Sequence, residues 1–388
     1  MVQRSYLAIF FVFSLSLALT LPLISYSSSH AQMQCDVVIN RSAVPDLNFD
    51  RLTLLITVND ATNIQLSSHS QAVPFTKVGS QIMVTTELGE LNLEFDSGSN
   101  TNNLCKTTKA PLLNDRRWAW SHGFDDNVNL KAAIDEFRAK SWPATLFLIA
   151  NVYDQTREES YIVDEPYVNR ELIPAGWVLG NHSWSHEVFP LEPSIEDYRD
   201  DIRKAQTRLE DGISRSSNPD LKVISFASPN FSSWYELPFY QVAPTNDLML
   251  LEVGNDIVFQ VANNQDYHYA DGSIPAFGTR TKIGRDPTIE ISSSEVIENM
   301  DWMSQHSSDS VRFWYNTLSH GDNEANIKQV IDHVWDNYGP NGADEAWVTS
   351  STEIYSYILT RDNSVITTTM NGDVLESGSS IYLPLILR

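Results

Sequence analysis

The chain has 388 residues, of which 42% are hydrophobic, so it is long enough for a large core and more than one domain. The 50 Asp and Glu residues outnumber the 26 Lys and Arg residues and leave a formal net charge of −24. Because contact with phosphate groups needs a basic surface, this charge argues against a nucleic-acid partner. An acidic surface also disfavours anionic polymers and is compatible with an exported protein.

The first residues have the pattern of a removable signal peptide. Arg4 is the only early charge, an apolar stretch covers 6–24, and small residues stand at the two positions of 29–31 that a signal peptidase reads. We therefore expect 1–31 to be cleaved and the protein to be secreted or held at the cell surface. A membrane anchor is the alternative, but Ser and Pro interrupt the run and no basic flank follows it. We expect no membrane span in the mature protein.

Residues 32–100 differ in composition from the rest of the chain. Thr, Val and Asn are plentiful, and the alternating stretches 52–58 and 81–86 have the pattern of strands. We expect a small β-rich domain here that ends in a polar linker. The only two cysteines, Cys35 and Cys105, would both remain after signal removal. Export favours a disulfide between them, with two free thiols as the alternative.

From residue 116 onward, strand and helix patterns alternate. Strands are expected at 117–124, 144–150, 177–179, 223–227, 311–317 and 346–349. Helices are expected at 129–139, 194–213, 294–305 and 324–337, and from 352 onward. Such alternation predicts an α/β fold with a parallel sheet and crossover helices. The number of units suggests a (β/α) barrel or an incomplete barrel over 110–360, with functional groups at the carboxyl ends of its strands.

Two segments are less regular. Between 234 and 290, only 250–253 and 257–261 have strand patterns, and their place in the sheet stays open. The C-terminal segment 361–388 carries a hairpin signal at Asn371-Gly372-Asp373 and ends in an apolar run. This run either packs on the N-terminal β-domain or serves as a sorting tag.

Two short segments place metal-binding residue types at the expected ends of strands. Asp125 and Asp126 end one strand, and His182 and His186 follow another. One carboxylate and two imidazoles can hold a divalent transition metal with coordination positions left open, and the second carboxylate can act as a base. If the strand continues through both acids, their side chains point to opposite faces. The two segments predict metal-assisted hydrolysis, although adjacent acids alone usually form a solvated turn.

His320 lies three residues after the strand expected at 311–317, where it could donate a proton to a leaving group. An ordinary surface histidine is the alternative. We expect the histidines without such a placement to be structural: His122, His268, His306 and His333. Trp184, Phe231 and Trp234 lie close to the site segments in sequence, and their flat faces suit sugar rings. Core packing is the alternative for each of them.

Taken together, these segments resemble the polysaccharide deacetylase family, also called the NodB-homology domain or carbohydrate esterase family 4 type. The family's Phe-Asp-Asp motif matches 124–126, its paired-histidine motif matches 182–186, and its Leu-x-His motif matches 318–320. The motifs occur in the family's order, and the resemblance covers about residues 116–359. It implies a distorted barrel of strands and helices, in agreement with the alternation of patterns.

The resemblance also implies a role for each matching residue. Asp126, His182 and His186 would bind the metal, usually zinc, with another divalent transition metal left open. Asp125 would be the general base and His320 the general acid. The substrate would be an acetylated glycan that loses an N-acetyl or an O-acetyl group.

The family's third motif, Arg-x-Pro-x-Gly, is only partly present. The best match at 227–231 keeps Pro229 but lacks the arginine that orients the base in the family. Asn230 could still supply an oxyanion amide, and Arg280 or Arg285 could replace the missing guanidinium. Trp184 and Trp234 would contact substrate. The family's fourth motif, with Asp and Trp, has a weak counterpart at Asp301-Trp302.

The missing arginine keeps a second interpretation open, a carbohydrate-binding protein on the same fold with little catalysis. A third interpretation is hydrolysis of a non-sugar amide, because the same metal and base could serve such a substrate.

Overall fold

The computed structural model describes most of the chain. It describes residues 31–41, 50–153, 163–187, 189, 192–213, 222–231, 233–235, 238, 249–253, 258–262, 265–269, 282–309, 311–321 and 323–375. The expected signal peptide before Ala31, the apolar run at 381–388 and Arg280 lie outside these ranges. No helix within them has both the length and the apolar character needed to cross a membrane.

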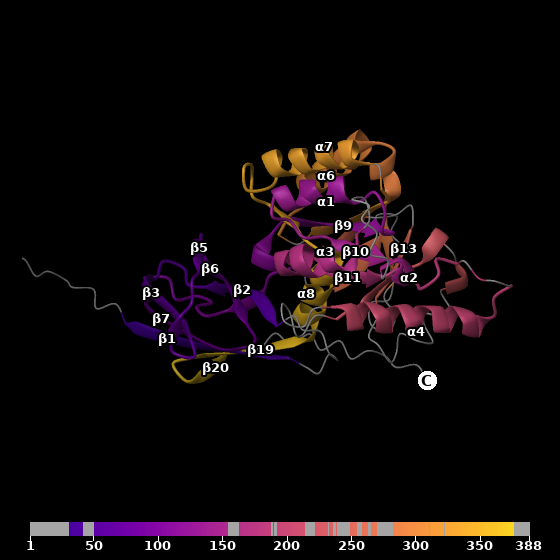
Figure 1. Ribbon diagram of the computed structural model, residues 1–388. Helices are drawn as coiled ribbons and strands as arrows, with labels where there is room; N and C mark the ends of the chain where they lie inside the picture. The colour runs from indigo at the N-terminus through magenta and orange to yellow at the C-terminus, as the bar shows by residue number, and fades with distance from the viewer. Residues whose placement is uncertain are drawn as a thin grey trace, which may run out of the picture.

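The N-terminal part consists of two antiparallel sheets (Figure 1). The first has the order β20-β19-β1-β7-β3-β4, formed by β1 (Gln32–Arg41), β3 (Thr62–Ser68), β4 (Gln71–Ala72), β7 (Gly89–Asp96), β19 (Ser364–Met370) and β20 (Asp373–Leu375). The second has the order β5-β6-β2-β8, formed by β2 (Arg51–Thr57), β5 (Thr76–Val78), β6 (Gln81–Glu87) and β8 (Thr107–Lys109). Along β6 every second residue from Ile82 to Thr86 is buried, as the alternating sequence predicts.

This β-rich part is closed by contacts between distant segments. β19 pairs with β1 in a register that joins Cys35 to Met370 (Figure 1). Cys35 and Cys105 form a disulfide with their Cα atoms 5.9 Å apart, so the expected bridge links β1 of the first sheet to the turn before β8 of the second. The hairpin predicted near the C-terminus is present, because β19 and β20 pair around Asn371 and Gly372. Both turn residues have positive φ, as a tight hairpin turn requires.

The larger part is an α/β structure around one mixed sheet of order β15-β14-β17-β9-β10-β11-β12-β13-β16, with β18 also paired to β9. Its strands are β9 (Trp118–Asp125), β10 (Thr145–Leu148), β11 (Val178–Asn181), β12 (Ser225–Ala227), β13 (Met249–Val253), β14 (Val258–Ala262), β15 (Gln265–Tyr269), β16 (Lys282–Arg285), β17 (Arg312–Ser319) and β18 (Ala346–Val348). All neighbours from β17 to β16 along this order pair in parallel, whereas β14 pairs antiparallel with its neighbours. The expected α/β class with a parallel sheet is confirmed, and the barrel stays a prediction.

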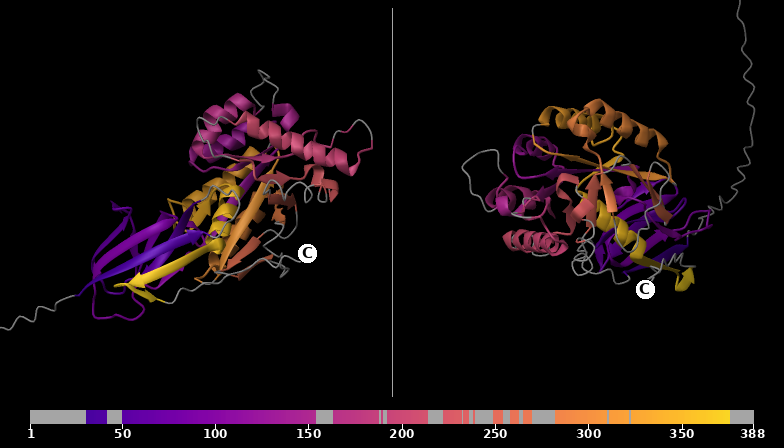
Figure 2. Two further views of the ribbon diagram at one scale, coloured as in Figure 1. Left: turned by 90° about the horizontal axis from the view of Figure 1, so that it is seen from below. Right: turned by 90° about the vertical axis from the view of Figure 1, so that its right-hand side faces the viewer.

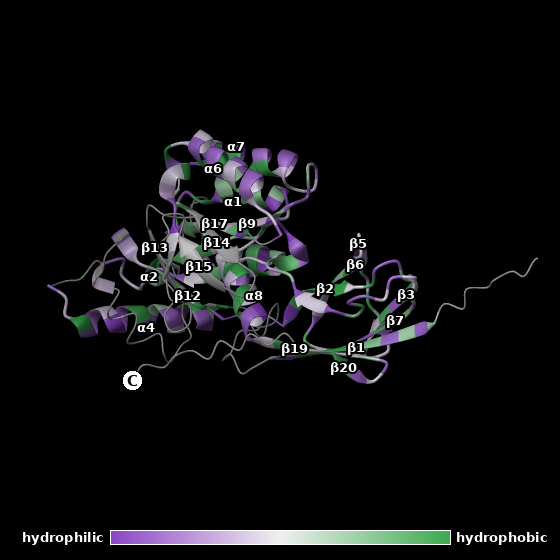
Figure 3. Cartoon of the chain, turned by 180° about the vertical axis from the view of Figure 1, so that it is seen from behind, coloured by the Kyte–Doolittle hydropathy of each residue, from purple (hydrophilic) through white to green (hydrophobic). Residues whose placement is uncertain are grey.

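Helices cover this sheet on two sides (Figures 1 and 2). They are α1 (Lys131–Ala139), α2 (Ala150–Tyr153), α3 (Glu165–Tyr167), α4 (Ile195–Gly212), α6 (Ser293–His306), α7 (Glu324–Asn337) and α8 (Ser351–Asn363). α1, α6 and α7 pack together on one side, and α4 lies on the opposite side. Along α7, hydrophilic and hydrophobic residues alternate in the pattern of a helix with one buried face (Figure 3). α4 begins at the predicted capping box of Ser194 and Asp197.

α8 connects the two parts of the molecule. It contacts both β2 of the β-rich part and β9 of the α/β part. The hydroxyl of Tyr357 donates to the carbonyl of Ala110, and Nη1 of Arg361 donates to the carbonyl of Pro111 at 2.7 Å. The chain then leaves α8 directly into β19 of the first sheet.

Candidate active site

The predicted site residues lie at the carboxyl ends of parallel strands. β9 ends at Asp125, β11 ends directly before His182, and β17 ends directly before His320. Because these strands run parallel, their carboxyl ends share one edge of the sheet. The placement at strand ends that the sequence predicts is therefore present in the structure.

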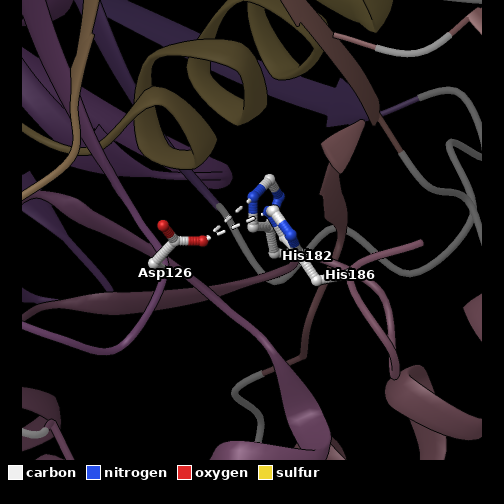
Figure 4. A group of neighbouring side chains, drawn as sticks. All are labelled: Asp126, His182 and His186. Atoms are coloured by element: carbon white, nitrogen blue, oxygen red, sulfur yellow. Dashed lines mark ion pairs between the residues drawn. The ribbon is translucent and has the colours of Figure 1, made fainter. Parts of the chain in front are cut away.

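Asp126, His182 and His186 form a group that fits a divalent metal ion (Figure 4). Oδ1 of Asp126 lies 3.6 Å from Nε2 of His182 and 3.4 Å from Nε2 of His186. The candidate ligand atoms all lie within 4.8 Å of one another. Oδ1 of Asp126 and Nε2 of His182 are buried without a hydrogen-bond partner, which is unfavourable unless a ligand binds them. One carboxylate and two imidazoles suit zinc or a similar metal.

The structure also sets the protonation of His182. Its Nδ1 lies 2.8 Å from the carbonyl oxygen of Ala227, which can only accept a hydrogen bond. Nδ1 therefore carries the hydrogen, and the lone pair of Nε2 faces Asp126. Burial lowers the pKa of His182 despite the opposing charges of Asp125 and Asp126. The ring is thus neutral, as a metal ligand must be.

Asp125 and Asp126 diverge for a different reason from the one expected. The strand does not continue through both residues, because β9 ends at Asp125 and Asp126 has a left-handed φ of 68°. The Asp125 side chain is 1% exposed, and the Asp126 carboxylate turns toward the two histidines (Figure 4). His186 is also left-handed, with φ of 54°. Each such residue costs on the order of 1 kcal/mol, and strain of this kind gathers at functional sites.

Arg285 supplies a guanidinium group to Asp125. Its Nη1 and Nη2 donate to the two carboxylate oxygens of Asp125 at 2.6 and 2.9 Å, and both side chains are buried. Burial alone would raise the pKa of Asp125, but the charge of Arg285 and its hydrogen bonds to the carboxylate outweigh it and hold the pKa below its ordinary value. Asp125 is therefore ionised at neutral pH and fixed in orientation by a two-point contact.

The neighbours of Arg285 explain how a guanidinium is accommodated here. It lies over the ring of Phe147, with 4.8 Å from Cζ to the ring centroid. A Cβ atom on Gly123 would lie 2.9 Å from that ring and 3.2 Å from Nη1 of Arg285. A Cβ on Gly180 would lie 2.3 Å from the same ring. Glycine at both positions leaves the space that the ring and the guanidinium occupy.

His320 is paired with Glu290, which lies at the end of the short helix η7 (Pro287–Glu290). Oε1 of Glu290 accepts from the backbone N–H of His320 at 2.5 Å and lies 2.8 Å from its Nδ1. This hydrogen bond raises the pKa of His320, with a further contribution from the charge of Asp125. The ring is therefore protonated over a wider pH range than an ordinary histidine and can act as an acid.

The residues expected to contact substrate lie in different environments, from partly buried to exposed. Pro229 and Asn230 follow β12, and Nδ2 of Asn230 donates to Oε2 of Glu187 at 3.1 Å. Trp184 packs partly against the core, with Nζ of Lys204 3.6 Å from its ring centroid. Trp234 is 72% exposed. The side chain of Phe231 lies outside the described part.

Sequence reasoning left two site residues unassigned. It offered Arg285 only beside Arg280, although 285–287 keeps the Arg-x-Pro order of the third motif at a later position. It missed Glu290, for which no local signal exists. Asp301, the counterpart of the fourth motif, accepts from Tyr338 and pairs with His333 instead. His122 is buried with both ring nitrogens hydrogen-bonded, and burial lowers its pKa to about 3, as a structural histidine would show.

Comparison with known proteins gives a family for part of the chain. The model of the family described as "Polysaccharide deacetylase" matches residues 114–229. No curated protein matches the chain. This matched region contains Asp125, Asp126, His182 and His186.

Solved structures with low sequence identity also match. A family 4 carbohydrate esterase from Streptomyces lividans is 13% identical, with TM-score 0.35, and the match covers 56% of this chain and 87% of that one. A family 4 acetyl xylan esterase from Clostridium thermocellum, in complex with a cobalt ion, is 15% identical, with TM-score 0.36 and 61% and 90% covered. The peptidoglycan deacetylase PdaC from Bacillus subtilis is 13% identical, with TM-score 0.35 and 62% and 90% covered. The match of the family model confirms the predicted resemblance to the polysaccharide deacetylase family for residues 114–229.

Proposed function

We propose that this chain is an exported, metal-dependent hydrolase that removes an acetyl group from a carbohydrate, on a distorted (β/α) barrel over 110–360. The observation that carries the proposal is the set of Asp126, His182 and His186, in which two buried ligand atoms have no hydrogen-bond partner. These residues lie in the region that matches the polysaccharide deacetylase family. Zinc suits this donor set, as does a similar divalent metal.

Asp126, His182 and His186 would hold the metal. When bound, it would polarise a water molecule and the acetyl carbonyl. Asp125 is the general base, because it is ionised and lies 4.0 Å from Nε2 of His182, beside the metal ligands. Arg285 keeps this carboxylate charged and in place.

His320 is the general acid on the leaving-group side. Water gives one proton to Asp125 while its oxygen bonds to the acetyl carbon. The C–N or C–O bond to the sugar then breaks, and His320 gives its proton to the departing amine or hydroxyl. Glu290 keeps His320 protonated until that step. The products are acetate and the deacetylated sugar.

The test combines metal content with acetate release. Purified protein should hold close to one equivalent of a divalent metal and release acetate from acetylated glucosamine oligomers or acetylated xylan. The variant His182→Ala/His186→Ala should lose the metal, whereas the control His306→Ala/His333→Ala should keep it. Asp125→Asn should keep the metal and lose about 10²–10⁴-fold in kcat/KM.

Other results would redirect the proposal. Acetate released only from a non-sugar amide would favour the third interpretation. Full activity in Asp125→Asn would refute the mechanism. The binding-protein interpretation rested on the missing arginine, and the contact of Arg285 with Asp125 removes that ground for it.

A further inference from the structure

We propose that Asp201 is a positioning residue for the metal centre: its carboxylate holds the loop between His182 and His186 in the shape that lets both rings reach one ion. The inference rests on the proposed metal site and deepens it. Asp201 lies on α4, outside every motif that carries the family resemblance.

The Asp201 carboxylate is 6% exposed and faces the loop between the two histidines. Its Oδ2 accepts from the backbone N–H of Trp184 at 3.3 Å, and its Oδ1 accepts from that of Ser185 at 3.1 Å. The hydroxyl of Tyr235 donates to Oδ2 at 2.8 Å. Burial and the charge of Asp201 raise the pKa of Tyr235, so its hydroxyl stays a donor. A buried carboxylate with these donors is well satisfied without any ion of its own.

The loop needs such support because its backbone is strained. Ser183, His186 and Glu187 all have left-handed φ, at 69°, 54° and 63°. Such residues persist only where the surrounding structure determines their conformation.

The other backbone N–H groups of the loop have hydrogen-bond partners that do not involve α4. The N–H groups of Trp184 and Ser185 differ, because both donate to Asp201 on α4. The N–H of Ser183 donates to Oδ1 of Asn181, and that of His186 donates to Oγ of Ser183, so both are satisfied locally. The N–H of His182 donates to the carbonyl of Leu148 on the adjacent strand. Among the described residues, Asp201 is the only one outside 181–186 whose side chain accepts from the backbone N–H groups between the ligands.

Loss of this contact should loosen the spacing of the two ligand rings, whose centroids are 5.1 Å apart. Groups that orient metal ligands without touching the ion typically affect metal affinity by about 10–100-fold when removed. Asp201→Asn keeps the size of the side chain but replaces one carboxylate oxygen by an NH₂ group. An NH₂ group only donates, so the asparagine side chain can no longer accept from the two backbone N–H groups with two separate oxygens.

The experiment measures the Kd of Co²⁺ and Zn²⁺ by chelator competition on the full chain, together with the visible absorption spectrum of the Co²⁺-loaded protein. Asp200→Asn is the matched control, because Asp200 is the neighbour of Asp201 on the same helix and its side chain is 71% exposed. The control loses the same charge as Asp201→Asn. We expect Asp201→Asn to raise the metal Kd about 10–100-fold and to change the cobalt spectrum. Asp200→Asn should leave both unchanged.

A folded Asp201→Asn protein with unchanged Kd and cobalt spectrum overturns the inference. If that variant does not fold, Tyr235→Phe decides, because it keeps the carboxylate and removes one donor to it. An increase in Kd in the same direction supports the inference, and an unchanged Kd refutes it. This experiment measures metal binding and no acetate, so it is independent of the acetate assay of the proposed function. If wild-type protein binds metal but releases no acetate in that assay, only the proposed activity is refuted. Wild-type protein that binds neither metal refutes both.

Discussion

The β-rich part and the α/β part bury different kinds of polar residue. In the two antiparallel sheets, buried polar side chains such as Thr53 and Thr86 carry only hydroxyl groups. All buried Asp, His and Arg side chains of the described residues lie between 122 and 361, in or next to the α/β part. The β-rich part is stabilised by apolar packing and a disulfide, whereas the α/β part has an apolar core and also holds buried charged groups, several of which form the candidate site. Substitutions in the β-rich part should therefore change stability alone, whereas substitutions at the buried charged groups of the α/β part should change both stability and activity.

The largest effect is expected from Arg285→Met in the α/β part. Removal of one member of a buried ion pair leaves Asp125 charged without a partner, which typically destabilises a protein by about 3–5 kcal/mol. Denaturant unfolding measures the loss. The control Arg203→Met removes two surface ion pairs of an arginine that is 49% exposed and should change the free energy of unfolding by less than about 1 kcal/mol.

A double variant sharpens this result. Asp125→Asn added to Arg285→Met removes the uncompensated charge and should restore part of the stability, although activity stays lost. If the single variant Arg285→Met is as stable as Arg203→Met, the buried ion pair does not contribute the predicted ~3–5 kcal/mol to the free energy of unfolding.

A loss of stability without a loss of activity is expected in the β-rich part. Cys35→Ser combined with Cys105→Ser removes a bridge that spans 70 residues, and about 2–5 kcal/mol of stability should be lost. The value of kcat for acetate release should stay within about twofold of wild type at a temperature where the variant is folded. A large loss of kcat with an intact fold would show that the two parts are not independent in the way proposed.

A smaller effect should appear as a change in pH dependence. The Glu290 hydrogen bond raises the pKa of His320, so the acid is present at low and neutral pH and is lost as the pH rises through that value. Glu290→Gln removes the largest cause of the increase. The alkaline decline of kcat/KM should therefore move to lower pH, while Asp125 remains ionised on the acid side. An unchanged pH profile would exclude His320 as the group that titrates.

The smallest effect is expected at Trp234, which is 72% exposed. If its ring contacts sugar, Trp234→Ala should raise KM with little change in kcat, because the contact is present in ground state and transition state alike. Stability should change by less than about 0.5 kcal/mol at so exposed a position. Trp302→Ala, at a residue 42% exposed on α6, is the matched control and should leave KM unchanged.

Local patterns in the sequence predicted most elements and identified the three residues that the structure brings together as candidate metal ligands. The capping box at Ser194 marks the start of α4, and the apolar periodicity of 324–337 coincides with α7. Asp126, His182 and His186 could be identified because each directly follows or lies near the end of a buried strand. Such signals involve only residues that are close in sequence, so they can be recognised without knowledge of the order of the strands in the sheet.

Contacts between distant segments could not be predicted in this way. Arg285 reaches Asp125 across 160 residues, and this approach depends on where β16 lies relative to β9. The patterns left that position open. Glu290 and Asp201 carry no distinguishing local sequence, because any acidic residue on a helix looks alike until its neighbours are known. The divergence of Asp125 and Asp126 depends on the left-handed φ of Asp126, a conformation that the alternation of a strand does not predict.

The pairing of β1 with β19 has a consequence for synthesis on the ribosome. The backbone N–H of Gln34 donates to Oδ1 of Asn371, 337 residues later, so one edge of β1 has no partner until nearly all of the described chain has emerged. At about 5–20 residues per second, that edge waits on the order of tens of seconds. An open strand edge can pair with other nascent chains in that time. The first sheet is therefore begun early and completed last, and chaperone demand should fall on its unpaired edge rather than on the α/β part.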